Sequence, residues 1–161
     1  MQTLLQLLAK NPAFVELNQT FCDVLVSCAS PCSFAQDEVI FKTGEPANQF
    51  FLIEDGRVRL TAHSPHKGPL HIMTLECGDV LGWSWLFPPY TWHFDATAVQ
   101  QSHAFQLDGA CVRDHCESDH EFGYKLLRCF SQIMLQRLLA TRLQLLDLYG
   151  EGPDPTNRTE T

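Results

Sequence analysis

The sequence predicts an α+β fold, in which helices at both ends of the chain flank an antiparallel β sandwich or barrel. Between residues 34 and 107, six short apolar runs alternate with turn signals and no crossover helix separates them, a pattern typical of antiparallel β architectures. Before and after this region the apolar residues recur at helical spacing instead. With 161 residues the chain is long enough for one domain with a sizeable core.

The N-terminal part, residues 1–33, is predicted to be helical. A short helical pattern covers residues 3–9. A second helix is expected from Asn18, a residue that caps helices well, to about Cys28. Pro31 then ends the helical pattern, because proline lacks the amide that a helix interior needs.

The middle part, residues 34–107, is predicted to hold the β-strands. Asp55-Gly56, between two apolar runs, is a strong hairpin signal. The expected strands are Val39–Phe41, Phe50–Ile53, Val58–Ala62, Leu70–Leu75, Phe94–Val99 and Ala104–Leu107.

The C-terminal part, residues 108–150, is predicted to form a short helix over Ala110–Cys116 and a long one over Glu121–Tyr149. A helix of that length spans roughly 42 Å, more than one face of a small barrel can cover. We therefore predict a homodimer paired along a heptad seam, the alternative being a bent helix wrapped on its own barrel. The seam consists of Leu127, Ser131, Met134, Leu138, Thr141, Leu145 and Leu148. A second apolar face comprises Leu126, Phe130, Ile133 and Leu143. Residues 151–161 are expected to be a flexible tail.

The stretch from Gly78 to Thr97, called the cassette below, holds all three tryptophans of the chain and a Pro-Pro pair. Such a rigid, aromatic-rich connection is where a pocket is expected. Three interpretations stay open. The rings fill the pocket, or they line it for an apolar or flat ligand such as haem or flavin, or they present a surface to a protein partner. The aromatic residues are Trp83, Trp85, Phe87, Tyr90, Trp92 and Phe94.

Composition excludes several functions. The net charge of −8 and the pI near 5.2 argue against general binding to nucleic acid or anionic membranes. No apolar run approaches the ~20 residues of a membrane span, and we expect a cytoplasmic protein. No nucleophile–base pair, glycine-rich phosphate loop or pair of catalytic carboxylates stands out, so no enzyme is predicted.

The cysteines and histidines give no clear metal site. The seven cysteines are irregularly spaced, so no disulfide framework is expected and most should be small buried hydrophobes. Around residues 114–120, His115, Cys116 and His120 are potential ligands. Cys111 shares a helix face with His115, but no second ligand pair is evident. No metal is therefore predicted.

Three segments resemble the cyclic-nucleotide-binding domain of the catabolite activator and Fnr-type regulators. Val39–Val58 (VIFKTGEPANQFFLIEDGRV) is similar to the family's glycine-punctuated hairpin. Gly78–Gly82 (GDVLG) resembles the start of its phosphate-binding cassette, and Asp95–Val99 (DATAV) the strand that leaves it. The resemblance covers about residues 12–149. It implies a jelly roll (a double-stranded β-helix) with N-terminal helices and a long C-terminal helix.

The resemblance also implies where a ligand would bind, and there the sequence departs from the family. The family holds a cyclic phosphate with backbone amides and an Arg, and the ribose with a Glu. Here Trp83 stands at the Glu position, and Phe94 or His93 at the Arg position. No Arg or Lys lies between Lys67 and Arg113. Since a buried phosphate needs a cation, ordinary cAMP binding is not expected.

We therefore expect a non-enzymatic regulatory or sensor module with a degenerate cassette, acting through another small molecule or a protein partner. In this fold a ligand would contact the long helix and shift its dimer geometry. The alternatives are a protein-interaction scaffold and a haem or metal redox sensor, with His93 as a haem ligand; the cofactor is unknown. Because too few residues follow Gly150 for a helix-turn-helix, no DNA binding is expected. The candidate ligand-binding residues are Gly82, Trp83, Ser84, Trp85, Trp92, His93, Phe94 and Thr97.

Overall fold

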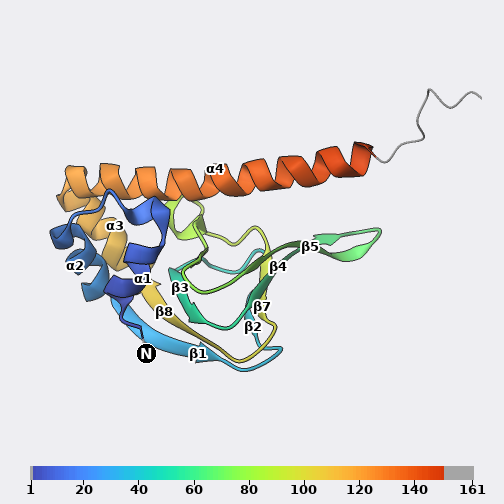
Figure 1. Ribbon diagram of the computed structural model, residues 1–161, viewed down its shortest axis with the longest axis horizontal. Coiled ribbons are helices and arrows are strands. Elements are labelled where there is room, and N and C mark those ends of the chain that lie inside the picture. The colour runs from blue at the N-terminus through green and yellow to red at the C-terminus, as the bar shows by residue number, and fades with distance from the viewer. Residues whose placement is uncertain (1, 151–161) are drawn as a thin grey trace, which may run out of the picture.

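A computed structural model of the chain describes residues 2–150 and confirms the predicted fold class (Figure 1). Two four-stranded antiparallel sheets form the roll, one with the strand order β1-β8-β3-β6 and the other with the order β2-β7-β4-β5. The strands are β1 Ala29–Phe34, β2 Val39–Phe41, β3 Gln49–Asp55, β4 Val58–Ser64, β5 Gly68–Leu75, β6 Val80–Leu81, β7 Asp95–Ala98 and β8 Ser102–Asp108. The predicted tail lies outside the described residues.

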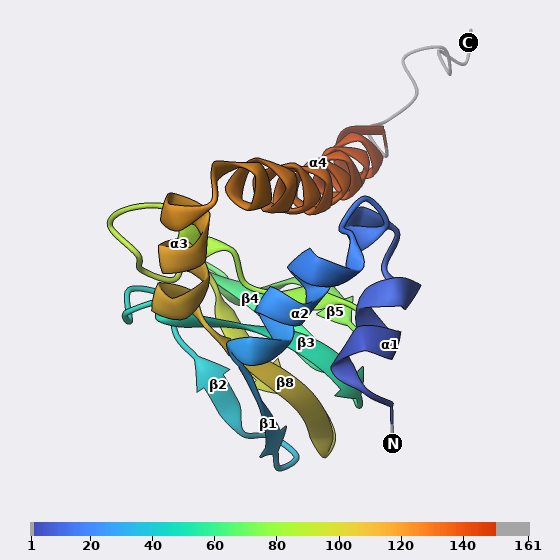
Figure 2. The same ribbon diagram turned by 90° about the vertical axis from the view of Figure 1, so that its left-hand side faces the viewer.

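Helices gather on the outer face of the β1-β8-β3-β6 sheet, and the longest of them crosses above the others (Figure 2). Their caps follow from the sequence: Thr3 forms a capping box with Gln6, and the Asn18 side chain accepts a hydrogen bond from the Phe21 amide at 2.8 Å. The helices are α1 Leu4–Lys10, the 3₁₀ turn η1 Pro12–Phe14, α2 Gln19–Ser27, the 3₁₀ turn η2 Ser84–Leu86, α3 Gly109–Ser118 and α4 His120–Gly150.

Two strands, β1 and β6, were not predicted. The roll begins at Ala29, not at residue 34, because β1 pairs with β8 from Ala29 opposite Leu107 onward. The β1 sequence ASPCSF shows no apolar alternation and contains a proline. Both features are typical of an edge strand. Because apolar residues do not alternate in it, the sequence carries no period-2 signal that would predict this strand. Strand β6 has only two residues.

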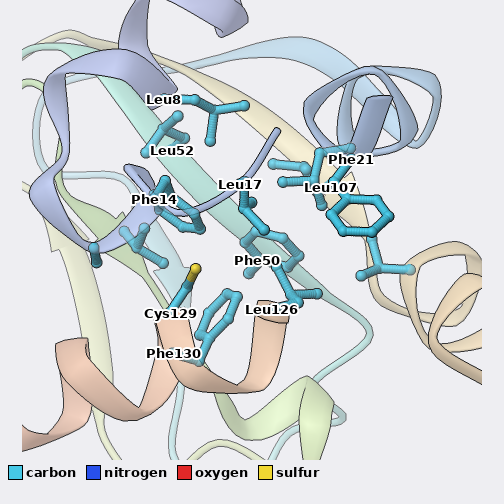
Figure 3. Packing of buried hydrophobic residues seen from close by; sticks show 14 of the residues in the cluster. Leu8, Phe14, Leu17, Phe21, Phe50, Leu52, Leu107, Leu126, Cys129 and Phe130 are labelled. Atoms are coloured by element: carbon cyan, nitrogen blue, oxygen red, sulfur yellow. The ribbon is translucent and has the colours of Figure 1, made fainter. Parts of the chain in front are cut away.

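The core has two parts that share strand β3. Because successive side chains of a strand point to opposite faces, Phe50 and Leu52 pack against the helices whereas Phe51 and Ile53 point into the roll. This explains the uninterrupted apolar run, since both faces of β3 are buried. Figure 3 shows the helix side, where Phe130 of α4 lies near Phe50; their ring centroids are 5.2 Å apart.

One face of helix α4 is buried over the first half of the helix, whereas the second half is exposed. Leu126, Phe130 and Ile133 are buried, as their place on the second apolar face predicted, but Leu143 of the same set is 63% exposed. Figure 1 shows α4 running on beside the β4–β5 hairpin as a single helix. There the Gln144 side chain donates to the Ile72 carbonyl at 3.3 Å. Among the described residues, no helix has the length and hydropathy needed to cross a bilayer.

Exposed leucines cover the outer part of α4. They include Leu138, Leu145 and Leu148 of the predicted seam at 66, 50 and 74% exposure. Such a row of apolar side chains in water is unfavourable unless a partner covers it. All the exposed leucines of the helix are Leu127, Leu135, Leu138, Leu139, Leu143, Leu145, Leu146 and Leu148.

Candidate ligand pocket between the roll and the long helix

The cassette aromatics are divided between the core and one pocket. Trp85 is completely buried and stacks on Phe50 with 4.6 Å between ring centroids, so it belongs to the helix side of the core. Trp92 stacks on Phe41 at 3.8 Å inside the roll. These two rings fill space, as the first of the three interpretations proposed. Trp83 does not, because it is only partly buried and touches both parts of the core.

The Trp92 ring packs directly against Gly82. A Cβ placed on Gly82 would lie 2.6 Å from the Trp92 ring, and the Gly82 φ of +97° is one that other residues rarely adopt. Only glycine therefore fits directly after β6.

Replacing Gly82 with Ala is expected to lower the free energy of unfolding by about 3 kcal/mol, from backbone strain and overpacking together. The matched control is Gly44→Ala, because Gly44 has a similar φ of +88° but nothing within 4 Å of an added Cβ. That variant should lose only about 1 kcal/mol. Urea unfolding of both variants measures the difference, and equal losses would show that Trp92 does not press on Gly82.

An apolar pocket of about 500 Å³ opens between the β4–β5 side of the roll and α4, within the size range of small-molecule sites. Trp83 and Phe94 form its cassette wall, and their rings meet edge to face at 5.7 Å. The complete lining is Leu60, Ile72, Met73, Trp83, Phe94, Met134, Arg137, Leu138 and Thr141. Two of the predicted ligand residues and three of the predicted seam residues thus meet in one place.

Arg137, which sequence reasoning missed, is the one charged residue among the described residues that line this pocket. Its Cζ lies 5.0 Å from the centre of the Trp83 ring, a cation–π contact, and its Nη2 donates to the Val80 carbonyl. Its Nη1 is fully buried, and no described residue accepts a hydrogen bond from it. The residue as a whole is partly exposed.

The electrostatic state of Arg137 follows from that enclosure. Burial lowers the pKa of Arg137 from its ordinary value to about 10, although the carboxylate of Asp79 opposes the shift. At neutral pH the group is still a cation. It is a buried positive charge with one donor to spare, which is the arrangement that an anionic group on a ligand would complete.

The sequence argument against phosphate binding considered only cations within the cassette. It is therefore incomplete. No Arg or Lys lies in the cassette itself, but the fold brings Arg137 to it from a helix about fifty residues further along. The apolar pattern of α4 held a partial signal. Arg137 continues the 4-3-4 spacing of Leu126, Phe130 and Ile133 on the buried second face, and a cation on a buried face is uncommon.

The other predicted ligand residues do not line the pocket. His93 is exposed, so the haem ligand expected there faces water, and no described histidine lines the pocket. Ser84 is buried with an unpaired Oγ, and Trp85 with an unpaired Nε1. Gly82 and Trp92 belong to the packed interior, and Thr97 lies in β7 opposite Val39.

The exposed aromatic surface that a scaffold would need is largely missing. Of the six cassette aromatics, Phe87 alone is an exposed residue, at 43%. Tyr90 is half-buried, with the Arg113 guanidinium 4.4 Å from its ring. The cassette is thus fixed to α3 by Arg113, whose Nη1 also donates to the Trp85 carbonyl at 2.5 Å.

The metal candidates are separated in the structure. His115 lies beside the sulfur atoms of Cys28 and Cys111, with all three groups within 4.8 Å of one another. Cys28 and Cys111 are joined by a disulfide, which the sequence analysis did not predict. Cys116 and His120 are not part of this group, so the three predicted candidates do not form one site.

Comparison with known proteins agrees with this fold. The family model for the cyclic nucleotide-binding domain matches residues 31–119. A CRP-like cAMP-activated global transcriptional regulator of Mycobacterium tuberculosis is 23% identical over 143 residues, which cover 89% of this chain and 62% of the regulator. The chain therefore spans about three-fifths of that relative.

Two solved structures show the same arrangement. A cyclic nucleotide-binding domain from Methylobacillus flagellatus has a TM-score of 0.79 at 18% identity, covering 89% of this chain and 81% of the other. The Thermus thermophilus catabolite activator protein has a TM-score of 0.68 at 21% identity, covering 87% and 63%. The fold and the family match define a regulatory type of domain. The chain belongs to the cyclic nucleotide-binding domain family.

Proposed function

We propose that this chain is a non-enzymatic regulatory module whose ligand is an apolar, flat organic anion bound between the roll and α4. The observation that carries this proposal is that Arg137, whose Nη1 has no described hydrogen-bond partner, is the one charged residue lining an otherwise apolar pocket. A buried cation without a partner is costly, and a ligand carboxylate, sulfonate or phosphate would relieve that cost. Trp83 and Phe94 supply aromatic faces for the body of the ligand.

Ordinary cAMP and cGMP are not the proposed ligands, although the mycobacterial relative is described as cAMP-activated. Trp83 replaces the acidic side chain that the family uses for the ribose, and the only hydroxyl among the lining side chains of the described pocket belongs to Thr141. A ribose would therefore leave polar groups unpaired in an apolar site. DNA is not a proposed partner either, because the net charge is −8.

A regulatory effect would pass through α4. Met134, Leu138 and Thr141 line the pocket and also belong to the predicted dimer seam. A ligand that contacts them changes the surface that a second copy would meet, so ligand binding and dimer geometry are coupled. We propose a homodimer in which both pockets adjoin the seam.

A thermal-shift screen tests the ligand class. A ligand that binds only the folded protein raises its melting temperature, by an amount that grows with its concentration relative to Kd. We expect no shift with cAMP or cGMP at millimolar concentration, and a rise of several degrees with 8-anilinonaphthalene-1-sulfonate, an aromatic anion. A shift of several degrees with either cyclic nucleotide, and none with the sulfonate, would refute the proposed ligand class.

A further inference from the structure

A cysteine pair joins the two ends of the roll. Cys28 is the C-terminal cap of α2 and Cys111 lies in the first turn of α3. Their Cα atoms are 5.8 Å apart, within the range that disulfides require. The two residues stand where β1 begins and β8 ends, and the Asp108 amide donates to the Cys28 carbonyl at 3.0 Å. The pairing of β1 with β8 therefore brings these two cysteines together.

The surroundings of this pair suit thiol chemistry. Cys28 is buried, but Cys111 is partly exposed. His115, one helical turn beyond Cys111 and also partly exposed, has a ring nitrogen within 4.8 Å of both sulfur atoms. Through one bridging water, or after a small movement of the ring, an imidazole so placed can accept the proton of a thiol and stabilise the thiolate that results.

The other half-buried and buried cysteines should compete poorly with this pair for reaction with a disulfide. Burial first, and then a nearby carboxylate, raises the pKa of Cys32, Cys116 and Cys129 to about 11. At neutral pH these three groups are almost entirely thiols, and the thiolate is the form that attacks a disulfide. Exchange should therefore be directed to the pair beside His115.

Helix α3 connects this pair to the cassette. Arg113, two residues after Cys111, donates to the Trp85 carbonyl and lies over the Tyr90 ring. The Gly109 amide donates to the Asn48 carbonyl at 2.8 Å. A covalent bond between α2 and α3 therefore also restrains the segment that holds Trp83 and Trp85.

We propose that Cys28 and Cys111 form a reversible dithiol–disulfide site that sets the rigidity of α3 and of the cassette. The oxidant is a low-molecular-weight disulfide such as oxidised glutathione. The Cys111 thiolate, its proton taken by His115, attacks one glutathione sulfur and releases one glutathione. The Cys28 thiol gives its proton to the glutathione thiolate just released, and its sulfur displaces the second glutathione from Cys111, which takes the proton held by His115. Two protein thiols are oxidised to one disulfide, and one glutathione disulfide is reduced to two thiols.

The test equilibrates the wild-type protein with mixtures of reduced and oxidised glutathione, followed by trapping of free thiols and peptide mass spectrometry. We expect one internal disulfide, between Cys28 and Cys111, that forms and is lost across these mixtures. Because it closes a separation of 83 residues, oxidation should raise the melting temperature by about 10 °C. Hydrogen exchange should slow in residues 83–92 and 109–118.

Variants identify the residues. Cys111→Ser should remove both effects, whereas Cys116→Ser on the same helix and Cys77→Ser at the surface should keep them. His115→Gln should slow disulfide formation about threefold, because the imidazole that accepts the Cys111 proton is lost. An equal rate for His115→Gln and wild type would remove His115 from the mechanism as proposed.

Three outcomes for the wild-type protein would overturn the proposal, and none depends on whether a variant folds. The first is a disulfide that persists in millimolar reduced glutathione, which would make it permanent. The second is equal melting temperature and hydrogen exchange in the oxidised and reduced forms. The third is a Zn²⁺ ion held by Cys28, Cys111 and His115 in the reduced protein that blocks oxidation.

Discussion

Replacing Arg137 with Met is expected to make the ligand-free protein more stable while removing its affinity for anions. At neutral pH the guanidinium is a cation whose burial is only partly offset by Asp79 and Trp83, and a Met of similar length would remove that cost at the expense of one hydrogen bond to Val80. We expect a net gain of about 1–2 kcal/mol, or roughly 3–6 °C in melting temperature. Affinity for 8-anilinonaphthalene-1-sulfonate should fall about 100-fold, as when one partner of a buried charge pair is lost.

The pKa of Arg137 gives the sign of the stability change expected for Arg137→Met. Burial gives Arg137 a pKa of about 10 in the folded protein, below the value that it has in the unfolded chain. The unfolded state therefore binds more protons between these values, so stability rises with pH across that window. At neutral pH the cost of the buried cation is fully present.

The matched control is Arg142→Met, the same substitution at an exposed position of the same helix outside the described pocket. That variant should change neither stability nor affinity by a measurable amount. A loss of stability in Arg137→Met, with sulfonate affinity unchanged, would mean that Arg137 is a structural anchor for Val80 and not a partner for a ligand.

The second large effect is expected at Leu145. Replacing Leu145 with Glu should convert the proposed dimer to a monomer, because each copy would place a charge within an apolar seam. Leu145 is half exposed and lies outside the described pocket, so the folded protomer should tolerate the change. Sedimentation equilibrium should show at least a 100-fold rise in the dimer dissociation constant.

Leu135 provides the control for the seam. It is 54% exposed on the same helix but is not a seam residue, so Leu135→Glu should leave the dimer intact. A wild-type protein that is already a monomer at 100 μM would contradict the dimer proposal directly. Equal weakening by both substitutions would mean that the helices pair on another face.

The sequence predicted most elements of the fold because their signals are local. Asp55-Gly56 between two apolar runs marks the β3–β4 hairpin, and Asn18 marks the start of α2. The start of the roll was misplaced because β1 is polar and contains Pro31. Its place is fixed by pairing with β8, a contact across more than seventy residues that no local pattern reveals.

The pocket was predicted only in part for the same reason. Trp83 and Phe94 could be placed in the cassette from their sequence context, but Trp85 and Trp92 have similar surroundings in the sequence and point into the core instead. Arg137 and the Cys28–Cys111 pair come from elements far apart in the chain. Contacts between residues so far apart depend on tertiary packing, so composition and spacing do not predict them.

The central claim is that Arg137 pairs with an anionic group on an apolar ligand, and a charge cycle tests it most directly. Two probes, 8-anilinonaphthalene-1-sulfonate and the uncharged N-phenyl-1-naphthylamine, share the same aromatic body and differ in the sulfonate. Fluorescence titration of both into wild type and Arg137→Met gives four affinities. We predict that the sulfonate strengthens binding at least about tenfold in wild type and not in the variant, since close charge pairs couple by more than about 1.4 kcal/mol. An equal preference for the sulfonate in both proteins would contradict the claim.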